Sequence, residues 1–440
     1  MRVLGIDIGT TTVKGAVLDL ESHEVGTPRV LAFPEPNPIE IPGRHETPMA
    51  AVLEAVGEVL DSLLEEAPDA RHLTLCGQMH GVTLMDAQGH ALTPFISWKD
   101  ARALEPHPSG DGTYMDVLGG CLTDEERAAL GNELRPGLGA TALAHLQDQS
   151  GIPNQSVPAT VCDAVMAAWT GSAPVLSPSF AASLGVYDLR TNAWAYDVIE
   201  KWNLSHLAWP MLGHQAHSVD ELCWKGKSLT VYPALGDHQA ALLGSGLQPD
   251  ELSINVSTGA QIAALSSHFH SGSYQTRPYF AGFYLNTISH LPDGRSLNHL
   301  IDLLTELFPV RSSADEIWDH IHQATAKVRT TSLRVDLSSS SKDFERAESH
   351  MRGITEETST IGHLFRAAFT SMAAAYRHHA KQLDPEIPWR TVALSGGLVQ
   401  RSRALREEIE DAFGRPLRVS MESEETLRGL LEWGAQCISE

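Results

Sequence analysis

The chain begins with two short, mostly apolar runs that have the pattern of β-strands. They cover residues 3–8 and 13–18 and are joined by the turn GTTT. Such runs on either side of a glycine-containing turn are typical of a buried hairpin. At residues 49–67 apolar positions recur every three or four residues and end at Pro68, which predicts a helix. The next apolar run, residues 72–76, predicts a buried strand that leads into the loop GQMHG.

The second half of the chain repeats this order. The stretch SINVSTGAQIA, from Ser253, matches GIDIGTTTVKG, from Gly5, and predicts a second hairpin. A helix predicted over residues 361–383 is again followed by a strand, TVALS, and a glycine pair. Self-similarity at this period indicates duplicated α/β domains. We therefore expect an N-terminal domain over residues 1–245 and a C-terminal domain over residues 246–440.

Other segments give simpler patterns. Glycine and proline in residues 105–120 predict a loop, and residues 122–169 predict helical segments with breaks between them. The end of the chain predicts a helix, a strand and a second helix, over residues 401–413, 417–421 and 425–438.

Charge and composition narrow the possible partners. The formal net charge of −23 argues against nucleic acid or an anionic membrane as a partner. We find no apolar run of the roughly 20 residues that a membrane span needs, and the first strand begins too early for a targeting peptide. The five cysteines are widely spaced and form no CxxC pair, so we expect reduced thiols and a cytoplasmic protein.

The opening turn has two interpretations. It lacks the spacing of a Walker loop and of the dinucleotide fingerprint, because Lys14 precedes Gly15 and no GxGxxG occurs. Taken alone, a tight hairpin between buried strands is the simpler reading. Turn amides and threonine hydroxyls can also form an anion-binding concavity. Because the turn occurs twice, in two domains that can grip opposite ends of a polyphosphate, we favour phosphate binding.

Several stretches, in this order, resemble motifs of the FGGY family of carbohydrate kinases: DIGTTTVKG, GQMHG, SWKDAR, GDHQAA, STGAQ and SGGLVQRS. The resemblance extends over essentially the whole chain. It implies two duplicated ribonuclease H-like domains of the actin and hexokinase type with a central cleft. It also implies a requirement for ATP and Mg²⁺.

The resemblance assigns a role to particular residues. Asp237 is the expected catalytic base, which accepts the proton of a substrate hydroxyl, although a helix-start aspartate has the same local pattern. Asp7 is the expected Mg²⁺ residue. Acceptor binding is expected from Gln78, Met79, His80, Trp98, Asp100 and Arg102, together with Asp237. ATP binding is expected from Thr10, Thr11, Thr12, Lys14, Thr258, Gly259, Gly396 and Gly397.

The acceptor implied by the resemblance is a ketose. QMHG resembles the ketose-kinase branch, and longer stretches such as RPYFAGFYLNTISHL resemble sedoheptulokinases more than xylulokinases. The expected reaction is transfer of the γ-phosphate of MgATP to the terminal primary hydroxyl, giving sedoheptulose 7-phosphate from sedoheptulose. A xylulose or ribulose kinase is the alternative within the family.

A second alternative belongs to another class: a nucleotide-switched ATPase, as in the actin and chaperone relatives of the fold. A polyol-binding loop and an acid in GDHQAA argue against it, because such an ATPase needs neither. The sequence does not determine the oligomeric state, and a homodimer is compatible with it.

Overall fold

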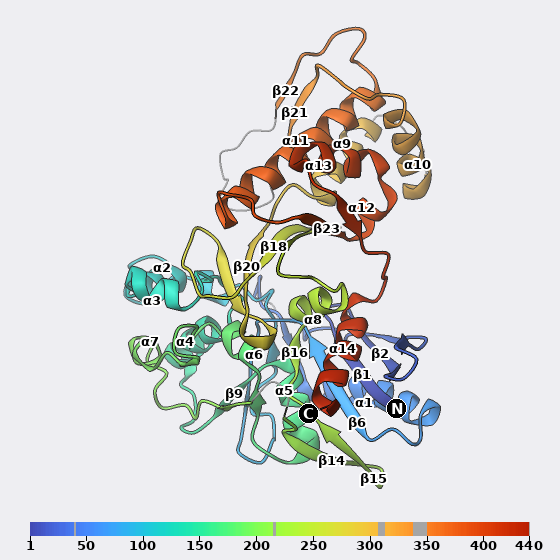
Figure 1. Ribbon diagram of the computed structural model, residues 1–440. Helices are drawn as coiled ribbons and strands as arrows, with labels where there is room; N and C mark the ends of the chain where they lie inside the picture. Colours follow the sequence, from blue (N-terminus) through green and yellow to red (C-terminus); the bar gives the residue numbers. More distant parts are fainter. Residues whose placement is uncertain (39–40, 214–216, 307–312, 338–349, 440) are drawn as a thin grey trace.

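The structure, a computed structural model, describes residues 1–38, 41–213, 217–306, 313–337 and 350–439. Two lobes are stacked one above the other (Figure 1). We call the part built around the first long sheet the first lobe, and the part built around the second long sheet the second lobe. In the part of the chain that the structure describes, we find no helix with the length and apolar character of a membrane span.

The first lobe is organised by the predicted hairpin. Strands β1 (Arg2–Ile8) and β2 (Thr12–Asp19) pair antiparallel, and β6 (His72–Gly77) pairs parallel to β1. The sheet order is β14-β15-β6-β1-β2-β3. Because side chains alternate across a sheet, one face of β1 packs against α1 (Met49–Glu66) and the other packs against α14 (Glu425–Ser439). Both faces are therefore covered, which explains the nearly continuous apolar run.

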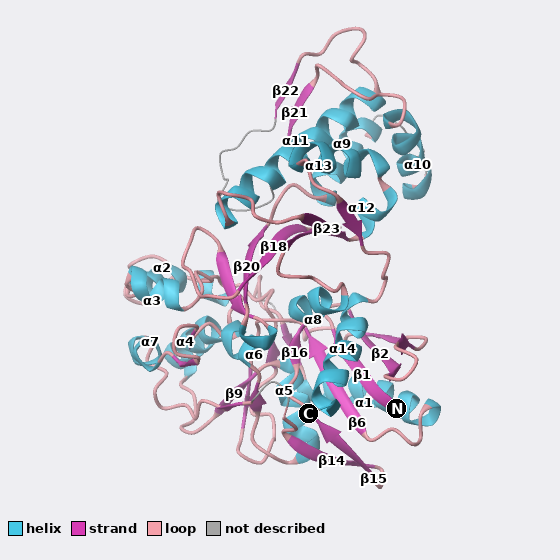
Figure 2. Ribbon diagram, in the orientation of Figure 1, coloured by secondary structure: helices cyan, strands magenta, loops and turns pink. Residues whose placement is uncertain are grey.

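The second lobe repeats this plan (Figure 2). Strand β17 (Glu251–Val256) pairs antiparallel with β18 (Ala260–Ser266) and parallel with β23 (Thr391–Ser395). The order of its sheet is β19-β20-β18-β17-β23-β24. Helix α11 (Ile361–Leu383) contributes much of the core on one face of this sheet. The duplicated α/β fold expected from the sequence is confirmed.

Two local predictions differ from the structure. The loop predicted over residues 105–120 ends in helix α2 (Tyr114–Gly120), which a capping box between Thr113 and Asp116 stabilises. The helix predicted over residues 401–413 begins two residues later, as α13 (Arg403–Phe413), because Ser402 leaves the helical conformation and caps it. A short helix that the sequence did not predict, α12 (Gly397–Arg401), precedes this cap.

The remaining elements complete the two lobes and their connections. The other helices are α3 (Asp124–Ala129), α4 (Gly139–Ser150), α5 (Val161–Thr170), α6 (Pro178–Ser183), α7 (Tyr196–Lys201), α8 (Asp237–Gly244), α9 (Gly294–Thr305) and α10 (Ala314–Thr325), with short 3₁₀ turns at Arg102–Leu104 and Phe280–Gly282. The other strands are β3 (Glu24–Val25), β4 (Arg29–Ala32), β5 (Glu46–Thr47), β7 (Thr83–Met85), β8 (Phe95–Ile96), β9 (Val157–Ala159), β10 (Val175–Leu176), β11 (Tyr187–Asp188), β12 (Ala193–Trp194), β13 (Met211–Leu212), β14 (Asp220–Trp224), β15 (Lys227–Val231), β16 (Leu235–Gly236), β19 (Gln275–Pro278), β20 (Tyr284–Ser289), β21 (Arg334–Asp336), β22 (His350–Arg352) and β24 (Leu417–Val419).

Helices α8 and α14 cross in close contact. A Cβ atom built on Gly429 would lie 1.9 Å from the carbonyl oxygen of Ala240, and one built on Gly244 would lie 2.0 Å from that of Glu425. Glycine is therefore required on both helices for the backbones to approach this closely. The last helix of the chain, α14, packs on the first lobe (Figure 1). The predicted division of the chain into two domains after residue 245 stays a prediction.

The lobes also meet where β19 reaches the first lobe. The amide of Thr276 donates to the carbonyl oxygen of Gly131 over 2.9 Å. The side-chain amide of Asn132 donates to the carbonyl oxygen of Gly272 over 2.9 Å. These bonds fix the segment around residue 132 opposite β19, and they place side chains from both lobes at one end of the cleft.

Candidate active site between the lobes

Asp237 directly follows strand β16, which runs parallel to its neighbour β6 in the first sheet. Strand β16 pairs with β6 so that Gly236 lies opposite Gly77, and the chains that leave these strands begin with Asp237 and Gln78. The amide of His238 donates to Oδ1 of Asp237 over 2.8 Å. Burial, and next the negative charge of Asp7, raise the pKa of Asp237 to about 7. A carboxylate with this pKa is suited to act as a general base near neutral pH.

A cavity of about 440 Å³ opens in front of Asp237. Five of the residues expected to bind the acceptor line it: Gln78, Met79, His80, Trp98 and Asp237 itself. The other lining residues are Thr10, Arg135, His238, Ala241, Gln261, Arg277, Ser289, His290 and Thr426. Residues from both lobes therefore form one cavity around the carboxylate.

Hydrogen bonds orient two of these side chains toward the opening turn, residues 9–12. The side-chain Nε2 of Gln78 donates a hydrogen bond to the carbonyl oxygen of Gly9 over 3.1 Å. Nε1 of Trp98 donates one to Oγ1 of Thr10 over 3.0 Å. Oε1 of Gln78 is buried and has no hydrogen-bond partner within the described ranges. It is therefore available to accept a hydrogen bond from a hydroxyl group in the cavity.

Asp100 and Arg102 lie outside this cavity. Oδ1 of Asp100 accepts a hydrogen bond from Nε of Arg102 over 2.8 Å, and its Oδ2 accepts one from the amide of His45, also over 2.8 Å. Both side chains are almost completely buried. The geometry gives this pair a bracing role for the loop that carries Trp98, in place of the direct acceptor contact expected for Asp100.

Asp7 faces α14, because it shares the face of β1 that packs against this helix. Its Oδ2 accepts a hydrogen bond from Oγ1 of Thr426 over 2.7 Å, whereas its buried Oδ1 has no partner in the described part of the chain. Burial raises the pKa of Asp7, although the bond from Thr426 opposes this effect. Nearby, Nζ of Lys14 lies 2.9 Å from Oε2 of Glu424.

A smaller cavity of about 290 Å³ lies in the second lobe. It is lined by Ser257, Thr258, Gly294, Asn298, Trp318, His322, Gly397, Leu398 and Arg401. Gly396 adopts φ 96°, and a Cβ there would lie 2.5 Å from the carbonyl oxygen of Val256, so only glycine fits. The cavity thus lies between the second hairpin turn and the glycine pair, two features singled out in the sequence.

Not every expected nucleotide residue lines a cavity. Thr10 lines the larger one, and Thr258 and Gly397 line the smaller one. The residues Thr11, Thr12, Lys14, Gly259 and Gly396 lie in the same turns but are not lining residues of either cavity. Their expected contacts with ATP stay predictions.

Comparison with protein families matches both ends of the chain. Residues 2–109 match the N-terminal domain of the FGGY family of carbohydrate kinases, and residues 299–435 match its C-terminal domain. The chain belongs to the FGGY family. It is a carbohydrate kinase, so the interpretation as a non-metabolic ATPase is wrong.

Curated members of the family are similar over most of their length. The sedoheptulokinase of Mus musculus is 24% identical, with 94% of this chain and 93% of that protein covered, and that of Homo sapiens is 23% identical with the same coverage. The xylulose kinase of Escherichia coli K12 is 24% identical, but 61% of this chain and 55% of that protein are covered.

Solved structures of FGGY kinases share the fold. A gluconate kinase from Lactobacillus acidophilus superposes with a TM-score of 0.83 at 16% identity, covering 100% of this chain and 90% of its own. A xylulose kinase from Rhodospirillum rubrum gives a TM-score of 0.84 at 20% identity, covering 99% and 91%. At these identities the likeness establishes the fold alone.

The sequence did not point to several residues of this FGGY kinase's cavity, among them Arg135, His238, Arg277 and Thr426. His238 could have been noticed, because it follows the expected base directly in GDHQAA. Arg277 and Thr426 carry no comparable signal, since the chain path alone brings them to the cavity.

Proposed function

We propose that the chain transfers the γ-phosphate of MgATP to the terminal primary hydroxyl of a ketose, with sedoheptulose as the preferred acceptor. The observation that carries this proposal is the position of Asp237: a partly buried carboxylate, with its pKa raised to about 7, that lines a cavity between the lobes together with Gln78 and Arg277. In phosphoryl transfer the protein mainly positions the reactants and stabilises charge. A base beside the acceptor hydroxyl supplies the one proton transfer that the reaction needs.

The residues act in a defined order. The acceptor binds against Gln78, His80 and Trp98, with its terminal hydroxyl beside Asp237. Asp237 takes the hydroxyl proton as the oxygen attacks the γ-phosphorus. The hydroxyl and amide groups of the turn at Thr10 and of the turn at Thr258 hold the phosphate oxygens. Closure of the lobes excludes water, which would otherwise replace the sugar as the attacking group.

The donor set at Asp7 fits Mg²⁺. Mg²⁺ keeps several waters and takes one or two carboxylates, and Asp7 offers a buried oxygen without a partner in the described residues. No cluster of three or more metal-binding side chains occurs in those residues, in keeping with a metal held mainly by phosphate and water. When bound, Mg²⁺ neutralises charge on the phosphates. Lys14, which is paired with Glu424 in this structure, leaves that carboxylate and binds a phosphate oxygen, so that it adds a positive charge beside the phosphates.

The charges around the larger cavity favour a neutral acceptor. Arg135 and Arg277 are cations, and Glu133 and ionised Asp237 balance them. Burial lowers the pKa of His80 and of His238, which keeps both rings neutral. A sugar acid would leave one uncompensated negative charge in a buried site, which is costly. A ketose without a charge fits this balance.

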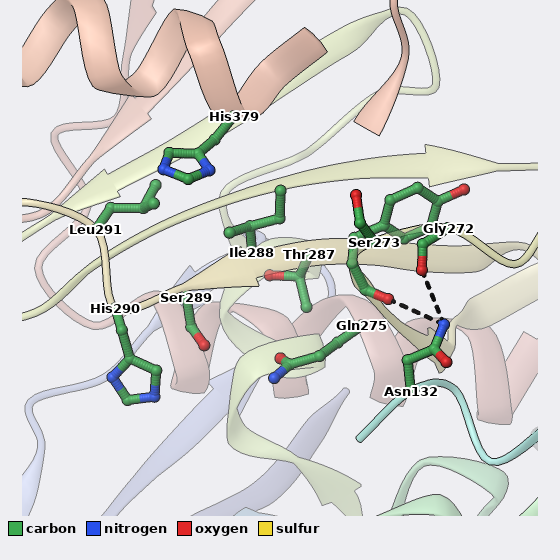
Figure 3. Close-up of a pocket in the computed structure, with 11 residues that line it drawn as sticks. Asn132, Gly272, Ser273, Gln275, Thr287, Ile288, Ser289, His290, Leu291 and His379 are labelled. Atoms are coloured by element: carbon green, nitrogen blue, oxygen red, sulfur yellow. Dashed lines mark hydrogen bonds between the residues drawn. The ribbon is translucent and has the colours of Figure 1, made fainter. Parts of the chain in front are cut away.

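A second cavity gives room for a longer acceptor. It measures about 410 Å³, and Figure 3 shows the residues that line it. Two of them, Ser289 and His290, also line the first cavity, so the two cavities are neighbours. The wall of the second cavity includes the polar side chains of Gln275 and Thr287 beside the apolar side chains of Ile288 and Leu291. A seven-carbon ketose that extends from Asp237 past Ser289 can use this space. The likeness to sedoheptulokinases over 94% of the chain supports the same choice.

A comparison of acceptors tests the proposal. ADP release is measured with MgATP and D-sedoheptulose, D-xylulose, D-ribulose, glycerol or D-gluconate, and kcat/KM is compared. We expect turnover only with added acceptor and the highest kcat/KM for sedoheptulose. A higher kcat/KM for xylulose would replace the seven-carbon assignment with a five-carbon one. Turnover with no ketose, or with gluconate above all ketoses, would overturn the proposal.

A further inference from the structure

A buried ion pair lies beside the larger cavity, where one of its members, Arg277, is a lining residue together with Asp237. It joins Glu133 of the first lobe to Arg277 on β19 of the second lobe, and both side chains are almost fully buried. Nη2 of Arg277 lies 2.6 Å from Oε1 of Glu133, and Nε of Arg277 lies 2.9 Å from Oε2. This two-pronged contact fixes the plane of the guanidinium group.

The backbone holds this ion pair in register. The bond from the amide of Thr276 to Gly131 places Arg277 directly opposite Glu133. Because successive side chains on a strand point to opposite faces, Thr276 points away from the cavity and bonds Asn286, while Arg277 points into it. A buried ion pair of this kind is costly to form, so its close geometry suggests a role beyond stability.

The remaining guanidinium nitrogen of Arg277, Nη1, determines which ring nitrogen of His238 carries the proton. Nη1 of Arg277 lies 3.0 Å from Nδ1 of His238. A guanidinium group can only donate hydrogen bonds, so Nδ1 must accept and the ring proton must be on Nε2. Burial, and next the charge of Arg277, lower the pKa of His238 to about 3, so the ring stays neutral. The Nε2–H group is buried and has no partner among the described residues.

We propose that Arg277 is a positioning residue that holds His238 as the Nε2–H tautomer, so that this group donates a hydrogen bond to an acceptor oxygen next to the hydroxyl that Asp237 deprotonates. His238 and Asp237 are consecutive and line the same cavity. The recognised group is an oxygen with a free lone pair, either a second hydroxyl or a carbonyl. This inference rests on the proposed function, because it assumes that the sugar occupies this cavity.

One consequence concerns the lobes. The donor is part of the first lobe, but the residue that sets its tautomer comes from the second lobe. Recognition of this oxygen is therefore complete only while β19 is docked on the segment around Asn132. Besides Arg277, the ionisable groups around His238 are Asp237, Glu133, Arg135 and His80.

Nitrogen NMR of the full chain, with ¹⁵N-labelled histidine, tests the tautomer directly. The signals of His238 are identified by their loss in His238→Gln. We expect a protonated Nε2 and an unprotonated Nδ1, unchanged from pH 5.5 to 8.5. His80 is an internal reference with the opposite pattern, because its Nδ1 donates to the carbonyl oxygen of Ser183 over 3.1 Å. A proton on Nδ1 of His238 would overturn the inference.

Addition of acceptor tests the contact. Saturating D-sedoheptulose, or whichever ketose of the panel has the highest kcat/KM, should move the Nε2 signal of His238. No movement at saturation would overturn the inference. The proposed function is judged separately, since it depends on ADP release and not on this signal, and the tautomer is measured without any ligand.

Variants give a third test. Arg277→Gln should raise the KM for the acceptor about tenfold, the usual effect of one hydrogen bond, and should mix the tautomers of His238, with little change in the KM for MgATP. His238→Leu should have a larger effect than His238→Gln, which retains a donor. The matched control is Arg418→Gln, because Arg418 forms a similar two-pronged contact with Glu251 far from the cavity. Equal acceptor KM values in the Arg277 and Arg418 variants would contradict the inference. If a variant does not fold, the NMR spectra of the wild-type chain still test the tautomer and the contact with the acceptor.

Discussion

Oγ1 of Thr426 donates a hydrogen bond to Oδ2 of Asp7 over 2.7 Å, although the two residues are 419 positions apart. This bond joins the start of the last helix to the end of the first strand. It also leaves the other oxygen of Asp7 buried and available. The C-terminal helix is thus part of the candidate metal site, beyond its packing on the first lobe.

Replacement of Thr426 tests this contact. Thr426→Val should raise the KM for MgATP about tenfold at pH 7, because loss of the hydrogen bond raises the pKa of Asp7 further and weakens its hold on the metal. The effect should grow as the pH falls toward 6. Thr426→Ser keeps the hydroxyl and is the matched control. Equal KM values for the two variants would remove Thr426 from the site.

Replacement of the expected base tests the chemistry. Asp237→Asn should lower kcat by about two to four orders of magnitude, since the amide cannot accept the proton. Binding of MgATP, measured by calorimetry, should change little because the proposed nucleotide contacts involve other residues. Near-normal turnover of this variant would show that Asp237 is not the base.

The raised pKa of Asp237 predicts the dependence of activity on pH. Since the ionised carboxylate is the active form in the proposed reaction, kcat/KM for the acceptor should rise with pH and reach half its maximum near pH 7. Asp7→Asn removes a negative charge that raises this pKa, so the midpoint of the remaining activity should move to lower pH. A profile that is flat from pH 5.5 to 8.5 would contradict the assignment.

The same carboxylate should reduce stability at high pH. Its pKa in the folded chain, about 7, lies above the ordinary value of 3.8, so the folded state binds the proton more tightly than the unfolded state. The stability from this group is complete below about pH 4 and is lost as the pH rises through 7. Asp237→Asn should therefore resist urea better than the wild type at pH 8.5, with a smaller difference at pH 5.

Asp100 is the control, because folding lowers its pKa whereas folding raises the pKa of Asp237. Burial raises the pKa of Asp100, but the hydrogen bonds and charge of Arg102 outweigh it, and the pKa lies below its ordinary value. Asp100→Asn should therefore lower the urea midpoint at pH 8.5. If both variants shift the midpoint in the same direction, the argument from linkage fails.

The crossing of α8 and α14 should not tolerate an added methyl group. Gly429→Ala would place a carbon 1.9 Å from the carbonyl oxygen of Ala240, and we expect a loss of about 1–3 kcal/mol in the free energy of unfolding, measured by urea titration. Gly434→Ala, on the same helix, is the control: its Cβ would lie 3.6 Å from Val3, an ordinary contact. This change should be neutral or stabilise by about 0.5 kcal/mol.

The sequence alone determined the repeated hairpins, the helices over residues 49–66 and 361–383, and the position of Asp237 between a strand and a helix. These features depend on local apolar spacing and turn chemistry, which neighbouring residues encode. The same locality explains two errors. The short helix α2 depends on a capping box within a polar, glycine-rich stretch, and the break at Ser402 depends on a single cap.

Only the tertiary structure decided which distant side chains meet in the cleft. Arg277 and Glu133 are 144 positions apart, and their contact depends on the docking of β19 against the first lobe. Thr426 reaches Asp7 because the last helix returns to the first sheet. Asp100, a plausible sugar ligand in its motif, is instead held by Arg102. Such pairings follow from the path of the whole chain, because a side chain's partner depends on what folds against it and not on its sequence neighbours.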